Sequence, residues 1–285
     1  MDLSDKTELR WLSAALADVR DAAPKGDFLV VGAMARDLLL HFGHSVPITR
    51  ATTDIDLGVA VGSWDEFRKL GDACVKSGHF TSGRPGSHRL LHRSGVPLDL
   101  IPFGGVEREN GTIEWPEDNA VMGVLGYREA RATATQILLP EKLSVATVCL
   151  PMLAILKLMA WSERHAYAPQ KDASDLFLVL ENYLNDENTV RLYEVGAHLL
   201  EQEDFDYAVA GAWLAGYDAL QCITNHSEEP RRVLDAVENV LLTEADANGN
   251  LSLVGEVGAR APTAYKLLGG FRDGIIGEST RDKTT

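Results

Sequence analysis

The stretch that decides the fold is DIDLGVAV, residues 54–61, which we interpret as a buried β-strand. Side chains alternate between the two faces of a strand, so Asp54 and Asp56 point the same way while Ile55 and Leu57 face the core. Two carboxylates about 7 Å apart repel each other unless a positive charge lies between them. Oxygen ligands of this kind suit Mg²⁺, although a solvated strand edge can carry the same residues. The stretch therefore predicts either a metal-binding strand or an exposed strand edge.

A third carboxylate, Asp99, lies within a second apolar stretch, VPLDLIPF, residues 96–103. The leucines on either side of it face the core, and Asp99 faces the other side. A lone acid among apolar residues is costly unless it is paired or bound to a metal ion. If this strand lies beside the 54–61 strand, Asp54, Asp56 and Asp99 converge on one face. Such a triad is typical of two-metal phosphoryl or nucleotidyl transfer, in which one ion activates the attacking hydroxyl and the other holds the triphosphate.

A strand-to-helix turn, VVGA at residues 30–33, precedes the carboxylates. Gly32 allows the backbone to approach an anion there, and the first N–H groups of a helix donate to phosphate oxygens. Tight packing would explain one glycine at this turn equally well. We expect the helix to cover 33–42 and to end at Gly43.

Hydrophobic periodicity predicts a first half of mixed α and β structure and a second half of helices. The expected elements of the first half are helices over 6–22, 33–42 and 63–76, with Ser63 as N-cap, and strands over 28–31, 54–61, 88–93 and 96–103, the last two forming a hairpin. In the second half we expect helices over 152–165, 173–184, 190–200, 207–220 and 230–242, followed by a frayed polar end. The predicted domains are therefore 1–145 and 146–285.

Composition limits the class of protein. Of 285 residues, 45% are hydrophobic and 24% are charged, which excludes a disordered or fibrous chain. Apolar runs stay shorter than the roughly 18 residues of a membrane-spanning helix, so we expect no membrane association. The N-terminus has no secretion-signal pattern, and three scattered cysteines favour a reducing compartment. We therefore expect a cytoplasmic protein.

The charge balance disfavours one kind of partner. A net charge of −15 repels phosphate backbones, so broad non-specific binding of nucleic acid is not expected. Arg84, Arg89 and Arg93 cluster in the sequence, which leaves a local basic groove open as an alternative.

Lys157 interrupts the otherwise apolar run 152–161, so its helix is expected to be buried. A buried ammonium needs a partner, unless it extends along the helix to solvent. Asp172 and Asp175 lie three residues apart, on one face of a later helix. Asp175 is the better candidate partner, because Asp172 can be explained as an N-cap.

Several other polar residues have ordinary interpretations. His88 and His92 are expected to face solvent on a strand, where they lie too far apart to chelate one zinc ion. Arg36 and Asp37 are expected to pair locally.

These residues together resemble the polymerase-β-like nucleotidyltransferase superfamily. Its pattern is a strand, a Gly-Gly or Gly-Ser pair opening a helix, an Asp-x-Asp pair and a later aspartate. Here the pattern is Gly32-Ala33, Asp54-Ile55-Asp56 and Asp99, with Ala33 as a departure. GAMARD at 32–37 also resembles the GGxxRD run of tRNA nucleotidyltransferases.

The second half narrows the resemblance. LKLMAWSER at 156–164, followed by KDASDL at 171–176, is similar to the fourth motif of AbiEii-type nucleotidyltransferases. That family supplies toxins of bacterial toxin–antitoxin and phage-defence systems. The resemblance covers roughly residues 28–185.

The resemblance implies an α/β fold, in which a mixed-sheet nucleotidyltransferase domain is followed by a helical domain. It implies transfer of a nucleoside monophosphate from an NTP to a hydroxyl acceptor, with release of pyrophosphate. The implied metal ligands, for Mg²⁺ or Mn²⁺, are Asp54, Asp56 and Asp99, and Asp99 also helps to deprotonate the nucleophile. The implied nucleotide contacts are Gly32, Ala33, Lys157 and Arg164, with Asp175 supporting the site.

The implied acceptor is tRNA or a protein, and an antitoxin is an expected partner. Two alternatives stay open. One is a nucleotidyltransferase that modifies a small molecule such as an antibiotic, and the other is a catalytically silent nucleotide-binding module that interacts with other proteins.

Overall fold

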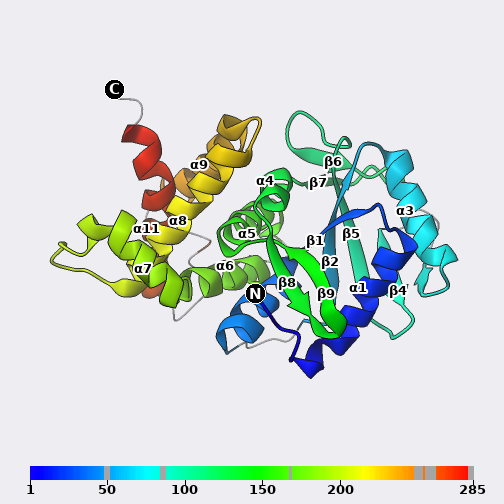
Figure 1. The fold of residues 1–285 in the computed structure, drawn as a ribbon. Coiled ribbons are helices and arrows are strands. Elements are labelled where there is room, and N and C mark those ends of the chain that lie inside the picture. Colours follow the sequence, from blue (N-terminus) through cyan, green and yellow to red (C-terminus); the bar gives the residue numbers. More distant parts are fainter. Residues whose placement is uncertain (48–51, 84–87, 167–168, 247–252, 254–260, 282–285) are drawn as a thin grey trace. The chain divides into compact units, whose positions relative to one another are not determined.

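The chain forms two compact units, Met1–Cys149 and Leu150–Thr285. The structure, a computed structural model, describes residues 1–47, 52–83, 88–166, 169–246, 253 and 261–281. The first unit combines a β-sheet with helices, and the second is built from helices (Figure 1). The predicted fold class is thus confirmed.

The first unit is built on a mixed sheet of seven strands in the order β3-β4-β5-β2-β1-β9-β8. Its central strand is β2 (Ile55–Val61), which runs parallel to β5 (Pro97–Gly104) and antiparallel to β1 (Asp27–Val31). A strand with neighbours on both sides and helices over the sheet is buried on both faces, which explains why residues after Asp56 are apolar or glycine.

Shorter strands complete the sheet. β4 (Arg89–His92) forms the predicted hairpin with β5, and Gly95 takes a left-handed conformation at the turn, with φ of 87°. β3 (Phe80–Ser82) pairs with β4 at one edge. At the other edge, β9 (Leu143–Thr147) runs parallel to β1 and antiparallel to β8 (Thr135–Leu139). β6 (Thr112–Glu114) and β7 (Val121–Gly123) form a separate two-stranded sheet.

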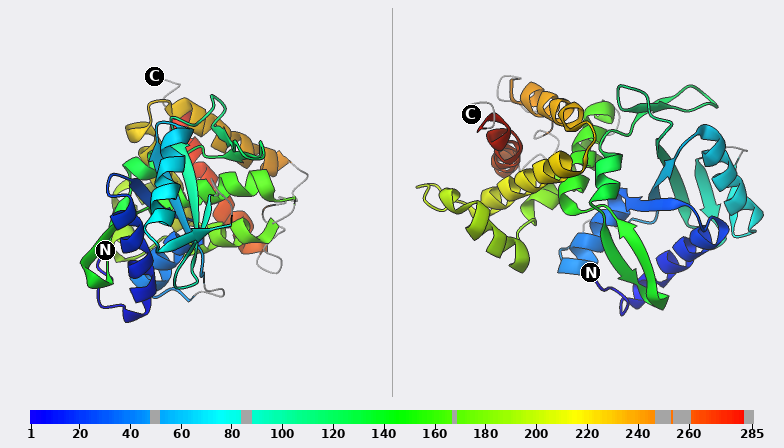
Figure 2. Two further views of the ribbon diagram at one scale, coloured as in Figure 1. Left: turned by 90° about the vertical axis from the view of Figure 1, so that its right-hand side faces the viewer. Right: turned by 45° about the horizontal axis from the view of Figure 1, so that its top comes forward.

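The predicted helices of the first unit are present. The 3₁₀ turn η1 (Thr7–Leu9) leads into α1 (Arg10–Ala22), which packs on α3 (Trp64–Lys76) along the sheet (Figure 2). Ser63 caps α3 as expected, since its Oγ accepts a 3.2 Å hydrogen bond from the Glu66 backbone N–H. A short helix, α4 (Tyr127–Ala132), follows β7.

The helix after β1 differs from its prediction in its second half. It begins as α2 (Gly32–Arg36) and continues as a π-helical stretch, η2 (Asp37–Phe42). The stretch ends at Phe42, as predicted, but Gly43 after it is right-handed with φ of −80°, and the left-handed residue is Ser45. A steric contact favours glycine at position 43, because a Cβ there would meet the side chain of Met1.

The described residues of the second unit contain all five predicted helices and one more. Their bounds are α5 (Leu150–Arg164), α6 (Pro169–Glu181), α7 (Asp186–Val195) with the 3₁₀ turn η4 (Ala197–Leu199), α8 (Tyr207–His226), α9 (Pro230–Asp246) and α11 (Ala261–Arg281). The expected frayed end is wrong as far as Arg281, because α11 extends to that residue. Within the described part of the chain, no helix combines the length and apolarity that crossing a membrane requires.

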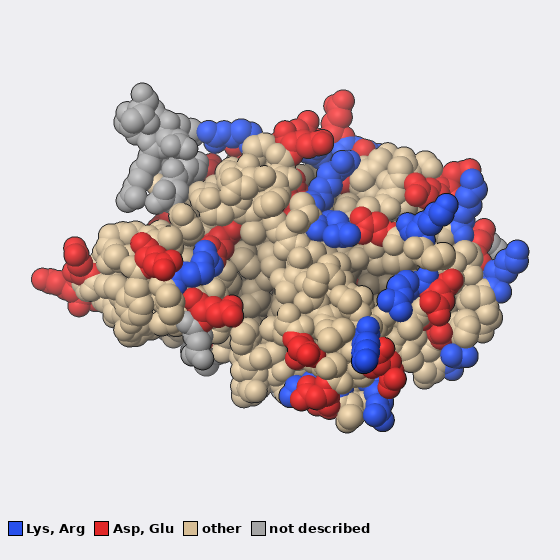
Figure 3. Space-filling model, in the orientation of Figure 1, with Lys and Arg blue, Asp and Glu red and all other residues tan. Residues whose placement is uncertain are grey.

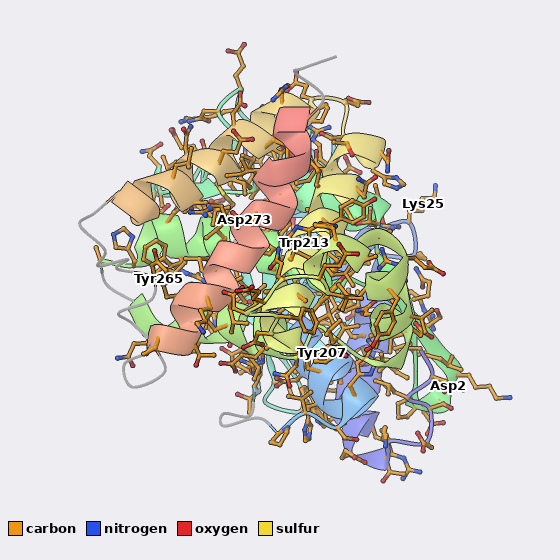
Figure 4. All side chains as sticks on the ribbon, turned by 90° about the vertical axis from the view of Figure 1, so that its left-hand side faces the viewer. Asp2, Lys25, Tyr207, Trp213, Tyr265 and Asp273 are labelled. Carbon is orange, nitrogen blue, oxygen red and sulfur yellow. The ribbon has the colours of Figure 1, made fainter. Side chains whose placement is uncertain are left out.

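Helices α8 and α11 approach each other closely through glycines. A Cβ at Gly274 would overlap the backbone carbonyl of Trp213, and a Cβ at Gly216 would overlap that of Phe271. Beside this contact lies a cavity of about 450 Å³, lined in part by Trp213 on α8 and by Tyr265 and Asp273 on α11 (Figure 4).

The glycine contact predicts opposite effects for two substitutions on one helix. Gly274→Ala forces a methyl group against the Trp213 carbonyl and should lower the free energy of unfolding by about 1–3 kcal/mol. Gly269→Ala meets no atom within 4 Å and should be neutral or raise it by about 0.5–1 kcal/mol. Denaturant unfolding followed by circular dichroism measures both. Equal effects of the two substitutions would contradict the close contact of α8 and α11.

Candidate functional site

The sheet brings two of the predicted carboxylates side by side. Asp56 on β2 and Asp99 on β5 are direct partners in the parallel register. Partners on adjacent strands lie about 4.8 Å apart and point to the same face of the sheet. The two strands are therefore adjacent, as the predicted convergence of carboxylates requires.

The third predicted carboxylate, Asp54, lies just before β2 and meets an arginine that sequence reasoning did not place in the site. Arg89 on β4 stands opposite Asp99 in the antiparallel register. Its Nη2 donates to Asp54 Oδ2 at 3.1 Å, and its Nε lies 3.6 Å from Asp99 Oδ1. One guanidinium therefore faces carboxylates from both strands.

Gly32 has a steric role beside Asp56. Its φ of 66° lies in the left-handed region that favours glycine. A Cβ at position 32 would overlap the Asp56 carboxylate. The glycine thus leaves the room that the Asp56 side chain occupies. Ala33, predicted to contact phosphate through its backbone, follows at the start of α2 with a buried side chain.

The donor set fits a hard divalent ion, but it is not gathered as a ready metal site. Over the described ranges, no group of three or more His, Cys, Asp or Glu side chains is close enough to hold a metal ion. Carboxylate oxygens are nevertheless the ligands that Mg²⁺ and Mn²⁺ prefer. The residues that would hold such an ion are Asp54, Asp56 and Asp99, and Arg89 would then have to leave Asp54 and Asp99. Metal binding stays a prediction.

Lys157 in the second unit has the expected partner and one more. Its Nζ lies 2.6 Å from Asp175 Oδ2 and donates to Asp172 Oδ1 at 3.2 Å. The side chain of Lys157 is only 5% exposed, so it does not extend to solvent. The predicted pairing with Asp175 is confirmed, and the nucleotide contact of Lys157 stays a prediction.

Asp172 is more than the helix cap that its position in the sequence suggested. Helix α6 begins at Pro169, so Asp172 lies inside the first turn, fully buried. Arg164 binds it through two nitrogens, Nε to Oδ2 at 2.5 Å and Nη2 to Oδ1 at 2.8 Å. Arg164, predicted to contact phosphate, therefore has a bidentate carboxylate partner within its own unit.

The surroundings of Asp172 shift its pKa. Burial alone would raise the pKa of this carboxyl, because it disfavours the charged form. Hydrogen bonds from Arg164 and the charge of Lys157 outweigh burial and lower the pKa below its ordinary value of 3.8. Asp172 is thus held as a carboxylate between two cations.

The prediction that His92 faces solvent is wrong. His92 is 3% exposed and does not face solvent. Its Nε2 lies 2.9 Å from Asp18 Oδ2, and its Nδ1 lies 2.7 Å from Ser94 Oγ. Leu90 and His92 share the buried face of β4, opposite to Arg89. The expected pairing of Arg36 with Asp37 is confirmed, as Arg36 Nε donates to Asp37 Oδ1 at 2.8 Å.

Charges of both signs are interspersed on the face shown in Figure 3. Two of the three arginines that cluster in the sequence have aspartate partners, since Arg89 meets Asp54 and Asp99 and Arg93 meets Asp18. Arg84 lies outside the described residues.

Comparison with known families supports the resemblance seen in the motifs. The sequence profile of the family described as "Nucleotidyl transferase AbiEii toxin, Type IV TA system" matches residues 14–249. The chain belongs to this family. The AbiEii match extends well beyond residues 28–185, over which the motifs are recognisable. It supports nucleotidyltransferase toxin activity in general. No curated protein matches the chain.

The contact of Gly32 with Asp56 predicts a coupling between the two positions. Gly32→Ala should lower the free energy of unfolding by about 2 kcal/mol, through backbone strain and overlap with the carboxylate. In an Asp56→Ala background the same substitution should cost less, because the overlapping carboxylate is gone. Denaturant unfolding of the four variants of this cycle measures the coupling. Additive effects would contradict the contact, and Gly71→Ala on α3, which meets no atom within 4 Å, is the control.

The lowered pKa of Asp172 predicts how stability depends on pH. A carboxyl whose pKa is lower in the folded state stabilises the fold above its unfolded value, near pH 4, and loses this contribution as pH falls through the folded pKa. We expect Asp172→Asn to be less stable at pH 7 and to lose less stability than the wild type as the pH falls below about 4. Urea unfolding between pH 7 and pH 2.5 tests this expectation. Parallel pH profiles of the two proteins would contradict it.

Proposed function

We propose that this AbiEii-family protein is a metal-dependent enzyme that transfers a nucleoside monophosphate from an NTP to a hydroxyl acceptor. The observation that carries the proposal is the registered pair Asp56 and Asp99 on adjacent parallel strands, with Gly32 leaving room for Asp56. Family membership independently supports nucleotidyltransferase activity.

Each proposed site residue of the first unit has a defined role. Asp54, Asp56 and Asp99 would hold Mg²⁺ or Mn²⁺, which when bound would offset part of the negative charge of the triphosphate and make the acceptor hydroxyl easier to deprotonate. Asp99 accepts the proton of that hydroxyl as its oxygen forms a bond to the α-phosphorus. The bond between the α-phosphorus and the bridging oxygen then breaks, and pyrophosphate leaves with the electron pair. The backbone of Gly32 and Ala33 donates to phosphate oxygens.

Three residues of the second unit keep the roles that the resemblance assigns. Lys157 and Arg164 contact nucleotide phosphates in this proposal, and Asp175 supports Lys157. The ion pairs with Asp172 and Asp175 fix where these two cations lie within their unit.

The acceptor we propose is a cellular macromolecule, tRNA or a protein, because a toxin acts by modifying a component that the cell needs. An antitoxin is the corresponding proposed partner, since the family is described from a toxin–antitoxin system.

Labelled nucleotide transfer tests the proposal. The protein is incubated with each α-labelled NTP, Mg²⁺ or Mn²⁺, and one acceptor at a time: total tRNA, cell protein, or an aminoglycoside antibiotic. We expect label in tRNA or protein, and a loss of at least about 100-fold with Asp56→Ala, because a metal ligand is removed. Asp72→Ala, which removes an exposed carboxylate on α3, is the matched control and should keep wild-type activity.

Two results would overturn the proposed activity. Equal labelling by the wild type and Asp56→Ala would remove the role of the carboxylates. Transfer to the antibiotic alone would replace the toxin proposal with a small-molecule modifying enzyme.

One observation favours a second candidate function, a catalytically silent nucleotide-binding module. The ion pairs of Arg89 with Asp54 and Asp99 place the positive charge of a protein side chain against these carboxylates. This alternative predicts NTP binding in equilibrium dialysis with no transfer of label to any acceptor.

A further inference from the structure

We propose that Arg89 is a built-in counter-cation of the carboxylate site, which holds Asp54 and Asp99 in the absence of a divalent ion and is displaced when one binds. Arg89 thereby sets the metal concentration at which the site fills. The inference rests on the proposed function for the choice of metal, and on the ion pairs of the described residues for its argument.

The topology of the sheet directs Arg89 to the carboxylates. The tight turn between β4 and β5 fixes the register of the hairpin, and this register sets Arg89 opposite Asp99. Arg89 and Leu91 form the exposed face of β4, whereas Leu90 and His92 are buried. The guanidinium therefore lies on the same face of the sheet as Asp99 and its partner Asp56.

Electrostatics explains why a cation is needed there. Asp54, Asp56 and Asp99 come from two adjacent strands, and carboxylates this close repel one another. Arg89 places positive charge against two of them. A divalent ion carries twice the charge of a guanidinium, so it would interact more strongly with carboxylates at the same place.

The contacts of Arg89 with the carboxylates have the geometry of weak ion pairs that can exchange. Among its contacts, Arg89 donates to Asp54 Oδ2 at 3.1 Å and approaches Asp99 Oδ1 at 3.6 Å, and its side chain is 54% exposed. Arg164 binds the buried Asp172 through two bonds of 2.5 and 2.8 Å, which is the tight arrangement in the same protein. The pair of Arg89 with Asp54 is exposed on both sides, and exposed ion pairs contribute little to stability, so the guanidinium can leave Asp54 at small cost.

Competition of this kind predicts that removing Arg89 improves metal binding. A fixed positive charge a few ångströms from a divalent ion repels it, and its loss should tighten binding by about tenfold or more. A residue that merely supports the fold would have the opposite effect, since its removal would loosen the carboxylates.

Mn²⁺ binding to the full chain without nucleotide tests the proposal, with free Mn²⁺ measured by electron paramagnetic resonance. We expect about tenfold tighter binding by Arg89→Ala and Arg89→Gln, and near wild-type binding by Arg89→Lys, which keeps the charge. Arg93→Ala is the matched control, because Arg93 follows β4 in the same hairpin and pairs with Asp18 instead. Adding Asp56→Ala to Arg89→Gln should abolish the gain, which locates the ion. Circular dichroism checks that each variant is folded.

The possible outcomes separate this inference from the proposed function. Unchanged or weaker Mn²⁺ binding by folded Arg89→Gln overturns the counter-cation role, even where labelled nucleotide is still transferred. A gain that persists without Asp56 also overturns it, because the ion then lies elsewhere. A gain that depends on Asp56 supports the inference even where no acceptor becomes labelled, a result that would overturn the proposed transfer alone.

Discussion

The repulsion between Asp56 and Asp99 is the constraint on which the first unit depends. The sheet places these carboxylates in register on adjacent parallel strands, where a nearby positive charge stabilises them. Two nearby residues fit this constraint. Gly32 has no side chain, which leaves room for Asp56, and Arg89 on β4 extends toward Asp99 on β5. The apolar residues that follow on β2 anchor the arrangement in the core. These carboxylates are the residues that we propose as ligands of a divalent ion.

The second unit contains a different arrangement of charges, a buried network of ion pairs. Lys157 and Asp172 are buried, so each charge needs a close partner, and Asp175 and Arg164 complete the network with short contacts. Removing one member leaves a buried charge without compensation, which makes such a network costly to open. Arg89, with an exposed side chain and longer contacts, can exchange its partners. The ion pairs of Arg89 can therefore exchange more easily than those of the buried network.

Local pattern predicted much of this structure. The alternation around Asp54 and Asp56, the hairpin turn at Gly95 and the cap at Ser63 each depend on a few neighbouring residues, and all three elements form as expected. Arg89 escaped prediction as a site residue because its meeting with Asp99 depends on strand register, which no local pattern reports. Asp172 was underestimated since a cap and a buried ion-pair partner look alike in sequence. Strands β8 and β9 were not predicted, because they are short and join the rest of the sheet through β1, a pairing that local sequence does not report. Helix α11 was not predicted, because its glycines weaken the helical signal.

The central claim is that the carboxylates of β2 and β5 bind a divalent ion together with the nucleotide. The most direct measurement is the anomalous scattering from crystals grown with Mn²⁺ and a non-hydrolysable NTP analogue. The account predicts an anomalous peak roughly 2.1 Å from oxygens of both Asp56 and Asp99, with the guanidinium of Arg89 turned away from Asp99. Nucleotide bound without any peak beside Asp56, and with Arg89 still paired to Asp54 and Asp99, would contradict it.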